Sequence, residues 1–305
     1  MIVKIATRKS KLALIQTDLF IKRLKECFPN IVYEIVPLIT TGDKIIDKNL
    51  YDIGGKALFL KELEEQLITG QVDLAIHSLK DVPGILPKEL EIAAVLERED
   101  PRDCFISYKY KSLQDLPTGS IIGSSSVRRK VIIQKIRPDL KIVNLRGNVQ
   151  TRLTKLSEDH NLDAIIIACA GLKRIKLFNK KYCFPFSVEE MIPCAGQGVI
   201  AVQKRVGDHK MFEICNKINH QFTWYLSQAE REFLAYFDAS CRTPISAYAE
   251  YIDNETIIAR YMYGDFDGNF LKFCVEKGSK TDAKQIAIRA AKIIELKLSS
   301  NHKLS

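Results

Sequence analysis

Three consecutive hydroxyl side chains stand where a predicted strand passes into a predicted helix. Ser124, Ser125 and Ser126 follow a short apolar run, and Arg128 and Arg129 open the helix. Hydroxyls, free N–H groups and the positive end of a helix dipole together favour an anion. Because neighbouring helical residues point about 100° apart, we expect the two arginines to hold different carboxylates. The alternative is a helix that Ser126 merely caps and whose arginines are solvated.

A second helix start carries the same residue types. Arg146 and Gly147 end the next apolar run, Asn148 can cap the following helix, and Arg152 lies one turn inside it. The planar fork of arginine suits a two-point grip on a carboxylate. Arg152 could instead pair with an acidic neighbour.

Near the start of the chain, polar residues again follow a predicted strand. Arg8 and Ser10 precede a helix that carries Gln16. Further on, Lys56 follows two glycines, but the spacing of a phosphate loop is missing and Ala57 offers no hydroxyl for magnesium. We therefore expect no nucleotide hydrolysis, and Lys56 remains as a cation on a turn that begins a helix.

A lysine and an aspartate stand side by side after a buried strand. Lys80 and Asp81 follow His77 and Ser78 and precede a turn marked by Pro83. A carboxylate beside cations at the end of a strand is a candidate acid–base group. An ordinary surface pair of Lys80 with Asp81 is the alternative. His77 is more typical of a hydrogen-bonded core histidine than of a catalyst.

One cysteine of the eight differs from the others in its surroundings. Cys241 lies in a small-residue loop, residues 238–244, beside Arg242, and an accessible thiol next to a cation can be reactive. The chemistry of that loop alone still favours an inert thiol. No CxxC pair is present, so we expect neither a zinc site nor a disulfide framework, and no metal.

The composition limits the class of protein. The chain has 305 residues, of which 46% are hydrophobic, so it can form two or three domains with buried cores. No apolar run approaches the ~20 residues that cross a bilayer, and the N-terminus reads as a strand without a signal-peptide core. We expect a soluble, cytoplasmic protein. The net charge of +9 favours an anionic partner, although it could also reflect drift on a solvated surface.

Short apolar segments alternate with amphipathic helices through roughly the first two hundred residues, which predicts an α/β fold with largely parallel sheets. The expected strands are Ile2–Ala6, Val32–Leu38, Val72–His77, Ile92–Leu96, Cys104–Ser107, Ser120–Gly123, Lys141–Leu145, Ala164–Ala168 and Val199–Val202. The expected helices are Lys11–Cys27, Leu58–Ile68, Val127–Ile136 and Val149–Ser157. A polar, proline-containing run at 97–103 indicates a linker between two α/β units that face each other across a cleft.

The last part of the chain predicts a small β-β-β-α domain. The expected elements are strands at Ile245–Ile252, Thr256–Tyr263 and Phe270–Glu276 and a helix at Ala283–Leu298. Before them, Ser227 and Glu230 have the spacing of a capping box, which predicts a helix that begins there and reaches about Phe237.

These segments, in this order, resemble the porphobilinogen deaminase family over nearly the whole chain. The residues that carry the resemblance are Ala6–Ser10, Gly54–Lys56, His77–Pro83, Arg98–Asp103, Ser125–Arg129, Leu145–Asn148 and Gly196–Gly198. The resemblance implies two α/β domains of the periplasmic-binding-protein type, at 1–96 with 198–217 and at 100–194. It also implies a small C-terminal α+β domain, at 220–305, which bears Cys241.

The same resemblance implies an activity and a cofactor. A porphobilinogen deaminase joins four porphobilinogens head to tail into hydroxymethylbilane, on a dipyrromethane cofactor built from substrate and attached here through a thioether to Cys241. Asp81 would be the catalytic residue. The implied cofactor ligands are Cys241, Lys80, Ser78, Ser124, Ser125, Ser126, Arg128, Arg129, Arg146, Gly147 and Arg152, and the implied substrate ligands are Arg8, Ser10, Gln16, Lys56 and Gln197. The chain departs from the family pattern at Ala239 and Ser240, where a glycine pair is usual, and at Ser124, where threonine is usual.

The charges of the substrate agree with these cations. Each pyrrole ring adds an acetate and a propionate, and at an effective dielectric of about 20 one charge pair at ~4 Å is worth about 4 kcal/mol. Carboxylates without partners would therefore stop elongation early. A non-catalytic anion-binding protein of the same two-lobed fold is the alternative.

A nucleic-acid-binding protein is a further alternative, but Trp224 and the scattered tyrosines do not form the aromatic platforms that it needs. We expect a monomer that binds a small-molecule substrate and neither nucleic acid nor a membrane.

Overall fold

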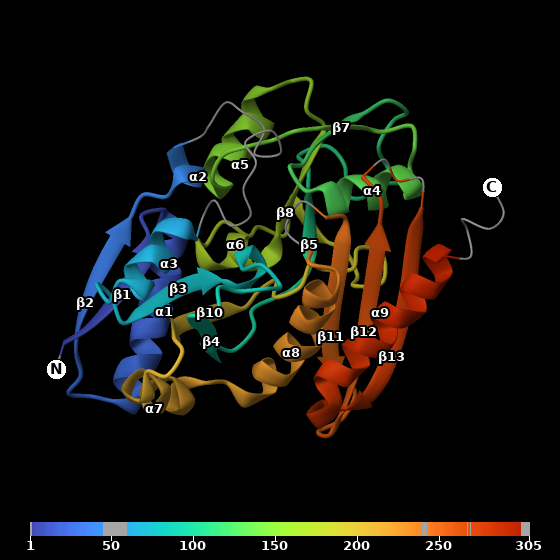
Figure 1. Ribbon diagram of the computed structural model, residues 1–305. Coiled ribbons are helices and arrows are strands. Elements are labelled where there is room, and N and C mark those ends of the chain that lie inside the picture. The colour runs from blue at the N-terminus through green and yellow to red at the C-terminus, as the bar shows by residue number, and fades with distance from the viewer. Residues whose placement is uncertain (1, 45–59, 240–242, 267, 269, 300–305) are drawn as a thin grey trace.

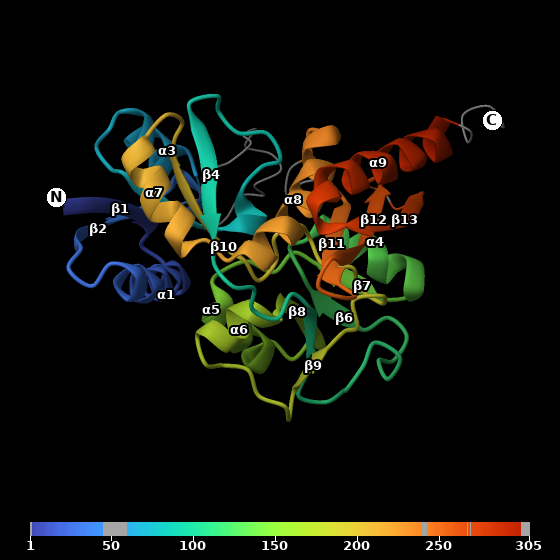
Figure 2. The same ribbon diagram turned by 90° about the horizontal axis from the view of Figure 1, so that it is seen from below.

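The computed structural model describes residues 2–44, 60–239, 243–266, 268 and 270–299. Two of the predicted site residues, Lys56 and Cys241, lie outside the described residues. The described chain forms two α/β lobes and a third domain. Figure 1 shows lobe 1 in blue and cyan at the left and the third domain in orange and red at the right, and Figure 2 shows lobe 2 beneath them.

Lobe 1 contains a five-stranded sheet in the order β2-β1-β3-β10-β4. Its strands are β1 (Ile2–Arg8), β2 (Val32–Leu38), β3 (Leu74–Ser78), β4 (Leu90–Val95) and β10 (Ile200–Arg205). Its helices are α1 (Lys11–Cys27), α2 (Thr41–Lys44), α3 (Lys61–Ile68) and α7 (His209–Ile218). Strand β1 pairs in parallel with β2 and β3, whereas β10 runs antiparallel to both β3 and β4.

Lobe 2 repeats this arrangement with a sheet in the order β7-β6-β8-β5-β9. Its strands are β5 (Asp103–Ile106), β6 (Ile121–Gly123), β7 (Lys141–Val143), β8 (Ala164–Ala168) and β9 (Cys183–Pro185). Its helices are α4 (Val127–Ile136), α5 (Val149–Glu158) and α6 (Cys169–Arg174). Here β5 is the antiparallel strand, placed between β8 and β9.

The antiparallel strand of each sheet is the one that follows a crossing of the chain between the lobes. The first crossing leads from β4 into β5, and the second leads back from lobe 2 into β10. The expectation of two α/β lobes with largely parallel sheets is confirmed. The inserted strands could not be distinguished from parallel ones, because both kinds are buried apolar runs in the sequence.

The third domain has the predicted β-β-β-α order. Its elements are α8 (Gln221–Tyr236), β11 (Ile245–Tyr251), β12 (Thr256–Gly264), β13 (Leu271–Ser279), the short 3₁₀ turn η2 (Lys280–Asp282) and α9 (Ala283–Ser299). The other 3₁₀ turn, η1 (Leu79–Asp81), lies in lobe 1 directly after β3. Helices α8 and α9 cover one face of the antiparallel sheet and enclose Phe233, Tyr261 and Ile286. From the other face, Tyr248 and Met262 join the core of lobe 2.

The predicted capping box is wrong. Helix α8 begins at Gln221, and the ring of His220 caps it by accepting from the amide of Thr223 at 3.3 Å. Ser227 and Glu230 lie inside the helix and are buried. Their spacing matches a capping box only because both face the same side of α8, where Glu230 binds the crossing segments.

Candidate active site

In lobe 1, polar residues gather where β1 and β3 end side by side. Arg8 is the last residue of β1 and Ser78 the last of β3. Ser10 caps α1 by accepting from the amide of Ala13 at 3.4 Å. The side chain of Gln16, one turn further, donates from Nε2 to Ser78 Oγ at 2.7 Å. The predicted residues of this edge are thus brought together.

Lys80 and Asp81 form the 3₁₀ turn η1 directly after β3, and both are half-buried. Within the described part of the chain, the Asp81 carboxylate makes no hydrogen bond or ion pair, so the alternative of a Lys80–Asp81 pair is not seen. Asp81 therefore offers an unpaired carboxylate at the carboxyl edge of the sheet, where open α/β sheets bind ligands.

His77 is a core residue, as expected. Its Nε2 lies 2.9 Å from Gln203 Oε1, and Gln203 donates in turn to Glu64 at 2.9 Å. Burial, and next the charge of Arg8, lowers the pKa of His77 to about 4 against the opposing effect of the Gln203 hydrogen bond. The imidazole is neutral at pH 7 and faces the interior of lobe 1.

In lobe 2, the three serines lie in the predicted turn between β6 and α4. Ser126 caps α4 by accepting from the amide of Arg129 at 3.4 Å. Ser124 accepts from the amide of Ser126 at 3.3 Å, and Ser125 donates to the carbonyl of Leu145 in the neighbouring loop. The serine turn and the loop after β7 are therefore joined.

The two arginines at the start of α4 bind one carboxylate, which corrects the expectation that they hold different ones. Arg128 Nη2 lies 2.7 Å from Oδ2 of Asp103, and Arg129 Nη2 lies 2.6 Å from Oδ1. Their remaining donors reach the carbonyls of Ile192 and Ile166, both at 2.8 Å. Long side chains can converge on a single oxygen pair even when their Cα–Cβ bonds diverge.

Asp103 is fully buried, and burial alone would raise its pKa, but Arg128 and Arg129 hold that pKa well below the usual range. Gln197 is a third residue that binds this carboxylate: its Nε2 donates to Asp103 Oδ1 at 3.0 Å and also to the carbonyl of Pro101 at 2.6 Å. Gln197, in the second crossing segment, thus binds the first crossing segment, and its neighbour Gly196 packs against Leu79 directly after the end of β3.

The second predicted helix start of lobe 2 brings Arg146 and Arg152 together, and no acidic side chain among the described residues pairs with either. Asn148 caps α5 by accepting from the amide of Thr151 at 2.9 Å, and Arg152 donates from Nε to the carbonyl of Gly147 at 2.8 Å. Gly147 has φ +115°, which favours glycine. The Nε of Arg146 is buried without a hydrogen-bond partner in the described structure.

Arg152 lies close to other cations. Burial, followed by the charges of Arg129 and Arg146, lowers the pKa of Arg152 to about 10. The alternative of an acidic partner for Arg152 is not seen among the described residues. Arg146 and Arg152, which have no acidic partner within the described ranges, are suited to a ligand that brings several negative charges.

The helix starts of the two lobes meet. A methyl group on Gly171 of α6 would lie 3.6 Å from the Val149 side chain at the start of α5. It would lie 3.9 Å from the Leu12 side chain at the start of α1. The two anion-favouring ends, one from each lobe, therefore converge on one region.

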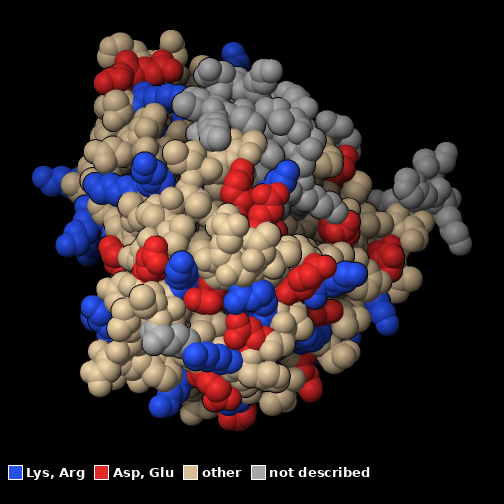
Figure 3. All heavy atoms as spheres, turned by 60° about the vertical axis from the view of Figure 1, so that its left-hand side comes forward, with Lys and Arg blue, Asp and Glu red and all other residues tan. Residues whose placement is uncertain are grey.

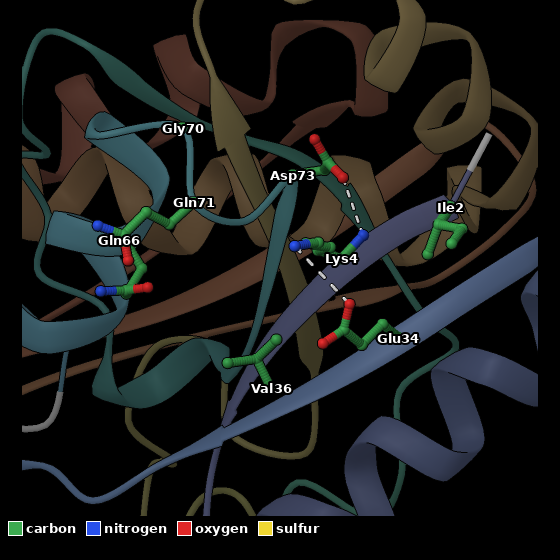
Figure 4. Close-up of a pocket in the computed structure, with 8 residues that line it drawn as sticks. All are labelled: Ile2, Lys4, Glu34, Val36, Gln66, Gly70, Gln71 and Asp73. Carbon is green, nitrogen blue, oxygen red and sulfur yellow. Dashed lines mark hydrogen bonds and ion pairs between the residues drawn. The ribbon is translucent and has the colours of Figure 1, made fainter.

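The hollow drawn in Figure 4 lies elsewhere. It is lined by Lys4, Glu34 and Asp73 among others, at the start of β1, and Lys4 bonds to Asp73 through its amide at 2.8 Å. Arg8, Ser78 and Asp81 stand at the opposite ends of the same strands. The hollow is thus separate from the predicted site.

Several residues that shape the site were missed from the sequence. Asp103 and Glu230 are buried acids that connect the crossing segments, Arg98 is a largely buried cation paired with Glu230, and Arg174 donates to the carbonyl of Gly198 at 2.7 Å. The polar run at 97–103, interpreted as a linker and as part of the family resemblance but not as site residues, contained the signal, because several charges in a short proline-containing stretch require partners when they are buried.

Fold and site together define a two-lobed α/β protein whose helix starts are suited to a polyanionic ligand, with a third domain attached at the crossings. The chain matches the family described as "Porphobilinogen deaminase, dipyromethane cofactor binding domain" over residues 3–213 and the one described as "Porphobilinogen deaminase, C-terminal domain" over residues 224–295. The chain belongs to the porphobilinogen deaminase family.

Curated relatives agree over almost the full length. "Porphobilinogen deaminase" of Rickettsia bellii is 53% identical over 297 residues, which cover 97% of this chain and 99% of that protein. "Porphobilinogen deaminase" of Rickettsia akari is 54% identical over 292 residues, which cover 96% and 97%.

Among solved structures, the methionine-binding protein MetQ aligns with a TM-score of 0.44 at 16% identity, over 78% of this chain and 93% of that one. The probable amino-acid-binding protein ytmK of Bacillus subtilis aligns with a TM-score of 0.45 at 10% identity, over 78% and 97%. Alignments this weak carry no argument about function. As a member of its family, the chain is a transferase of tetrapyrrole biosynthesis that acts on porphobilinogen and carries a dipyrromethane cofactor.

Proposed function

We propose that Asp81 is the acid–base group of this transferase, which deaminates four porphobilinogens and joins them head to tail into hydroxymethylbilane. The observation that carries the proposal is the unpaired Asp81 carboxylate at the end of β3, beside Lys80 and next to the Gln16–Ser78 pair. A carboxylate in these surroundings keeps its oxygens available to a substrate.

Two tasks of the reaction need such a carboxylate. Loss of ammonia leaves positive charge on the substrate ring, and a fixed negative charge beside it lowers the energy of that state. The leaving amine needs a proton, and the ring carbon that attacks in the coupling step must lose one to become aromatic again, so Asp81 can act first as acid and then as base.

The residues of lobe 2 fit the dipyrromethane, whose carboxylates need cationic donors. When bound, the cofactor supplies the pyrrole to which the first substrate ring is added. Arg146 and Arg152 have no acidic partner within the described structure and are the proposed carboxylate ligands. Ser124, Ser125 and Ser126, with Gly147, shape the turn that receives them.

The other predicted ligands take their proposed places around this turn. Ser78 and Lys80 complete the cofactor site, and Cys241 is the attachment point. Arg8, Ser10, Gln16, Lys56 and Gln197 are the proposed substrate ligands. Arg128 and Arg129 would act by holding the start of α4 in place through Asp103.

Single-turnover kinetics on cofactor-loaded protein test the role of Asp81. Asp81→Asn keeps the shape but neither the charge nor the basicity, so it should lose most of the release of ammonia while still binding porphobilinogen. Asp81→Glu should retain part of it, because the charge is displaced by only about one ångström. Release at the parent rate from Asp81→Asn would move the acid–base role to another group.

Intact mass tests the cofactor assignment. The active protein should exceed its sequence mass by two porphobilinogens less two ammonias, and Cys241→Ser should lack the increment. An increment that persists in Cys241→Ser places the attachment elsewhere, and its absence from active parent protein would favour the non-catalytic alternative.

The remaining properties are also proposals. The domain boundaries are 1–96 with 198–217, 100–194 and 220–305, and the protein acts as a cytoplasmic monomer without nucleic acid or membrane partners. No helix in the described ranges has the length and apolar character needed to span a bilayer. On the face shown in Figure 3, acidic and basic side chains are interspersed, unlike the uniform basic surface that nucleic acid requires.

A further inference from the structure

Arg231 of α8 binds the turn that follows Asp81. Its Nη2 donates to the carbonyls of Pro83 at 2.9 Å and Gly84 at 3.4 Å, and its Nη1 donates to the carbonyl of Val82 at 3.3 Å. Helix α8 belongs to the third domain, whereas the turn continues from η1 of lobe 1. One side chain therefore connects the two domains at the residues that directly follow the proposed catalytic residue.

The turn also lies against the backbone of α8. A Cβ atom on Gly84 would stand 2.6 Å from the amide nitrogen of Ala235 and 2.7 Å from the carbonyl carbon of Leu234. No side chain fits in that space. On the other side of the turn, Leu79 and Val82 pack in one apolar cluster with Trp224 of the same helix.

The contacts of Arg231 are all to backbone carbonyls. Among the residues that the structure describes, it forms no ion pair, and burial lowers the pKa of its guanidinium to about 10. A desolvated cation without a carboxylate contributes little to stability. Its five donors in a fixed fork are well suited to holding consecutive carbonyls in one geometry.

We propose that Arg231 is a positioning residue for Asp81: it holds the three carbonyls after Asp81 against α8 and so determines where the carboxylate stands. The inference rests on the role proposed for Asp81 above. Only the peptide link from Asp81 to Val82 separates the catalytic residue from the gripped turn, so a displaced turn displaces η1. A displacement of about 1 Å can lower a rate about 100-fold.

A double-mutant cycle separates positioning from general stability. With cofactor-loaded protein, Arg231→Gln should lower kcat by about 10- to 100-fold and change KM by less than about twofold. In the Asp81→Asn background the same substitution should change the rate by less than about twofold, because Arg231 acts through Asp81. Arg231→Lys, which keeps donors near the carbonyls, should restore part of the loss.

Arg137→Gln is the matched control. Arg137 also donates to backbone carbonyls, those of Leu113 at 2.6 Å and Leu116 at 3.0 Å, but it does so in lobe 2, away from the strand-end residues. Its replacement should lower the unfolding midpoint and leave kcat unchanged. A kcat loss in Arg137→Gln as large as that in Arg231→Gln would overturn the inference.

Two further measurements do not depend on turnover by Arg231→Gln. Hydrogen exchange at the amides of Val82 and Gly84 should be faster in Arg231→Gln than in Arg137→Gln, whether or not the protein carries cofactor. Gly84→Ala, which forces the turn off α8, should reproduce the kcat loss. In the Asp81→Asn background, Gly84→Ala should have no further effect on kcat.

The outcomes distinguish the two proposals. If Asp81→Asn keeps the parent rate, the role of Asp81 is wrong and the positioning inference fails with it. If Asp81→Asn loses the rate but Arg231→Gln and Gly84→Ala lower it equally in both backgrounds, or leave kcat unchanged, only the inference is wrong.

Discussion

Arg98 Nη2 lies 2.7 Å from Glu230 Oε2, and this ion pair joins the first crossing segment to α8 of the third domain. Glu230 also accepts from the amide of Gly196 in the second crossing at 2.7 Å and from the amide of Ala249 in β11 at 2.9 Å. One carboxylate, fully buried, therefore connects both crossings with the third domain.

Glu230→Gln should lower the free energy of unfolding by about 3–5 kcal/mol, because it leaves Arg98 as a buried cation without its carboxylate. Urea unfolding followed by circular dichroism measures the change. The exposed Lys61–Glu65 pair provides the control, since Glu65→Gln should stay within about 0.5 kcal/mol of the parent. A loss below about 1 kcal/mol in Glu230→Gln would show that the pair does not hold the crossings together.

Asp103→Asn should destabilise the protein by a similar ~3–5 kcal/mol, because Arg128 and Arg129 both lose their carboxylate. Arg129→Leu should also be destabilising, since it removes two of the donors to Asp103. The combined loss in the double variant should be smaller than the sum of the two single losses. Additive losses, measured by urea unfolding, would mean that the two residues stabilise the fold independently.

Replacing Arg152 should not destabilise the fold, in contrast to replacing Glu230 or Asp103. Because Arg152 is crowded by cations and has no acidic partner among the described residues, Arg152→Gln should leave the unfolding midpoint unchanged or raise it. The same variant should carry less cofactor, measured by intact mass as the fraction of loaded chains. Arg23→Gln, in an exposed pair with Glu26, should load normally. Full loading of Arg152→Gln would remove Arg152 from the proposed ligands.

Stability should fall as the pH is lowered from about 6.5 towards 4. The pKa of His77 is about 4 in the folded protein, whereas an unfolded histidine titrates near ~6.5. Between these values the unfolded chain binds a proton that the folded protein does not, so acidification favours unfolding, by up to ~3 kcal/mol. His77→Asn should remove this slope, measured by urea unfolding across the range, and His160→Asn, on an exposed residue, should keep it. An unchanged slope in His77→Asn would assign it to other groups.

Local features of the sequence were sufficient for most elements. The bounds of α1, α4, β2 and β8 agree with their predictions. The two helices begin where predicted because Ser10 and Ser126 cap them by accepting from amides only three residues further along the chain. Helix α6 was missed because it follows the apolar β8 without a polar break. The bounds of an element can be read from neighbouring residues when its caps are local.

The partners of the charged residues could not be predicted in this way. Asp103 is 94 residues from Gln197 in the sequence, and Arg98 is 132 residues from Glu230. Such pairs exist only after the two crossings have been placed side by side. The sequence therefore indicated which arginines were important at the start of α4, but not that a protein carboxylate already binds both of them.

The inserted strands have a consequence for the order in which the protein can fold during synthesis. Lobe 2 is contiguous from β5 to β9, so a ribosome that has released residue 185 has released every strand of its sheet. Lobe 1 is not complete at that point, because β10 separates β3 from β4 and is among the last strands before the third domain. Until Arg205 has emerged, β4 has no neighbour to pair with. The sheet of lobe 1 therefore cannot be completed until β10, which follows lobe 2 in the chain, has been synthesised. Until then the edge of β3 is open to chaperones.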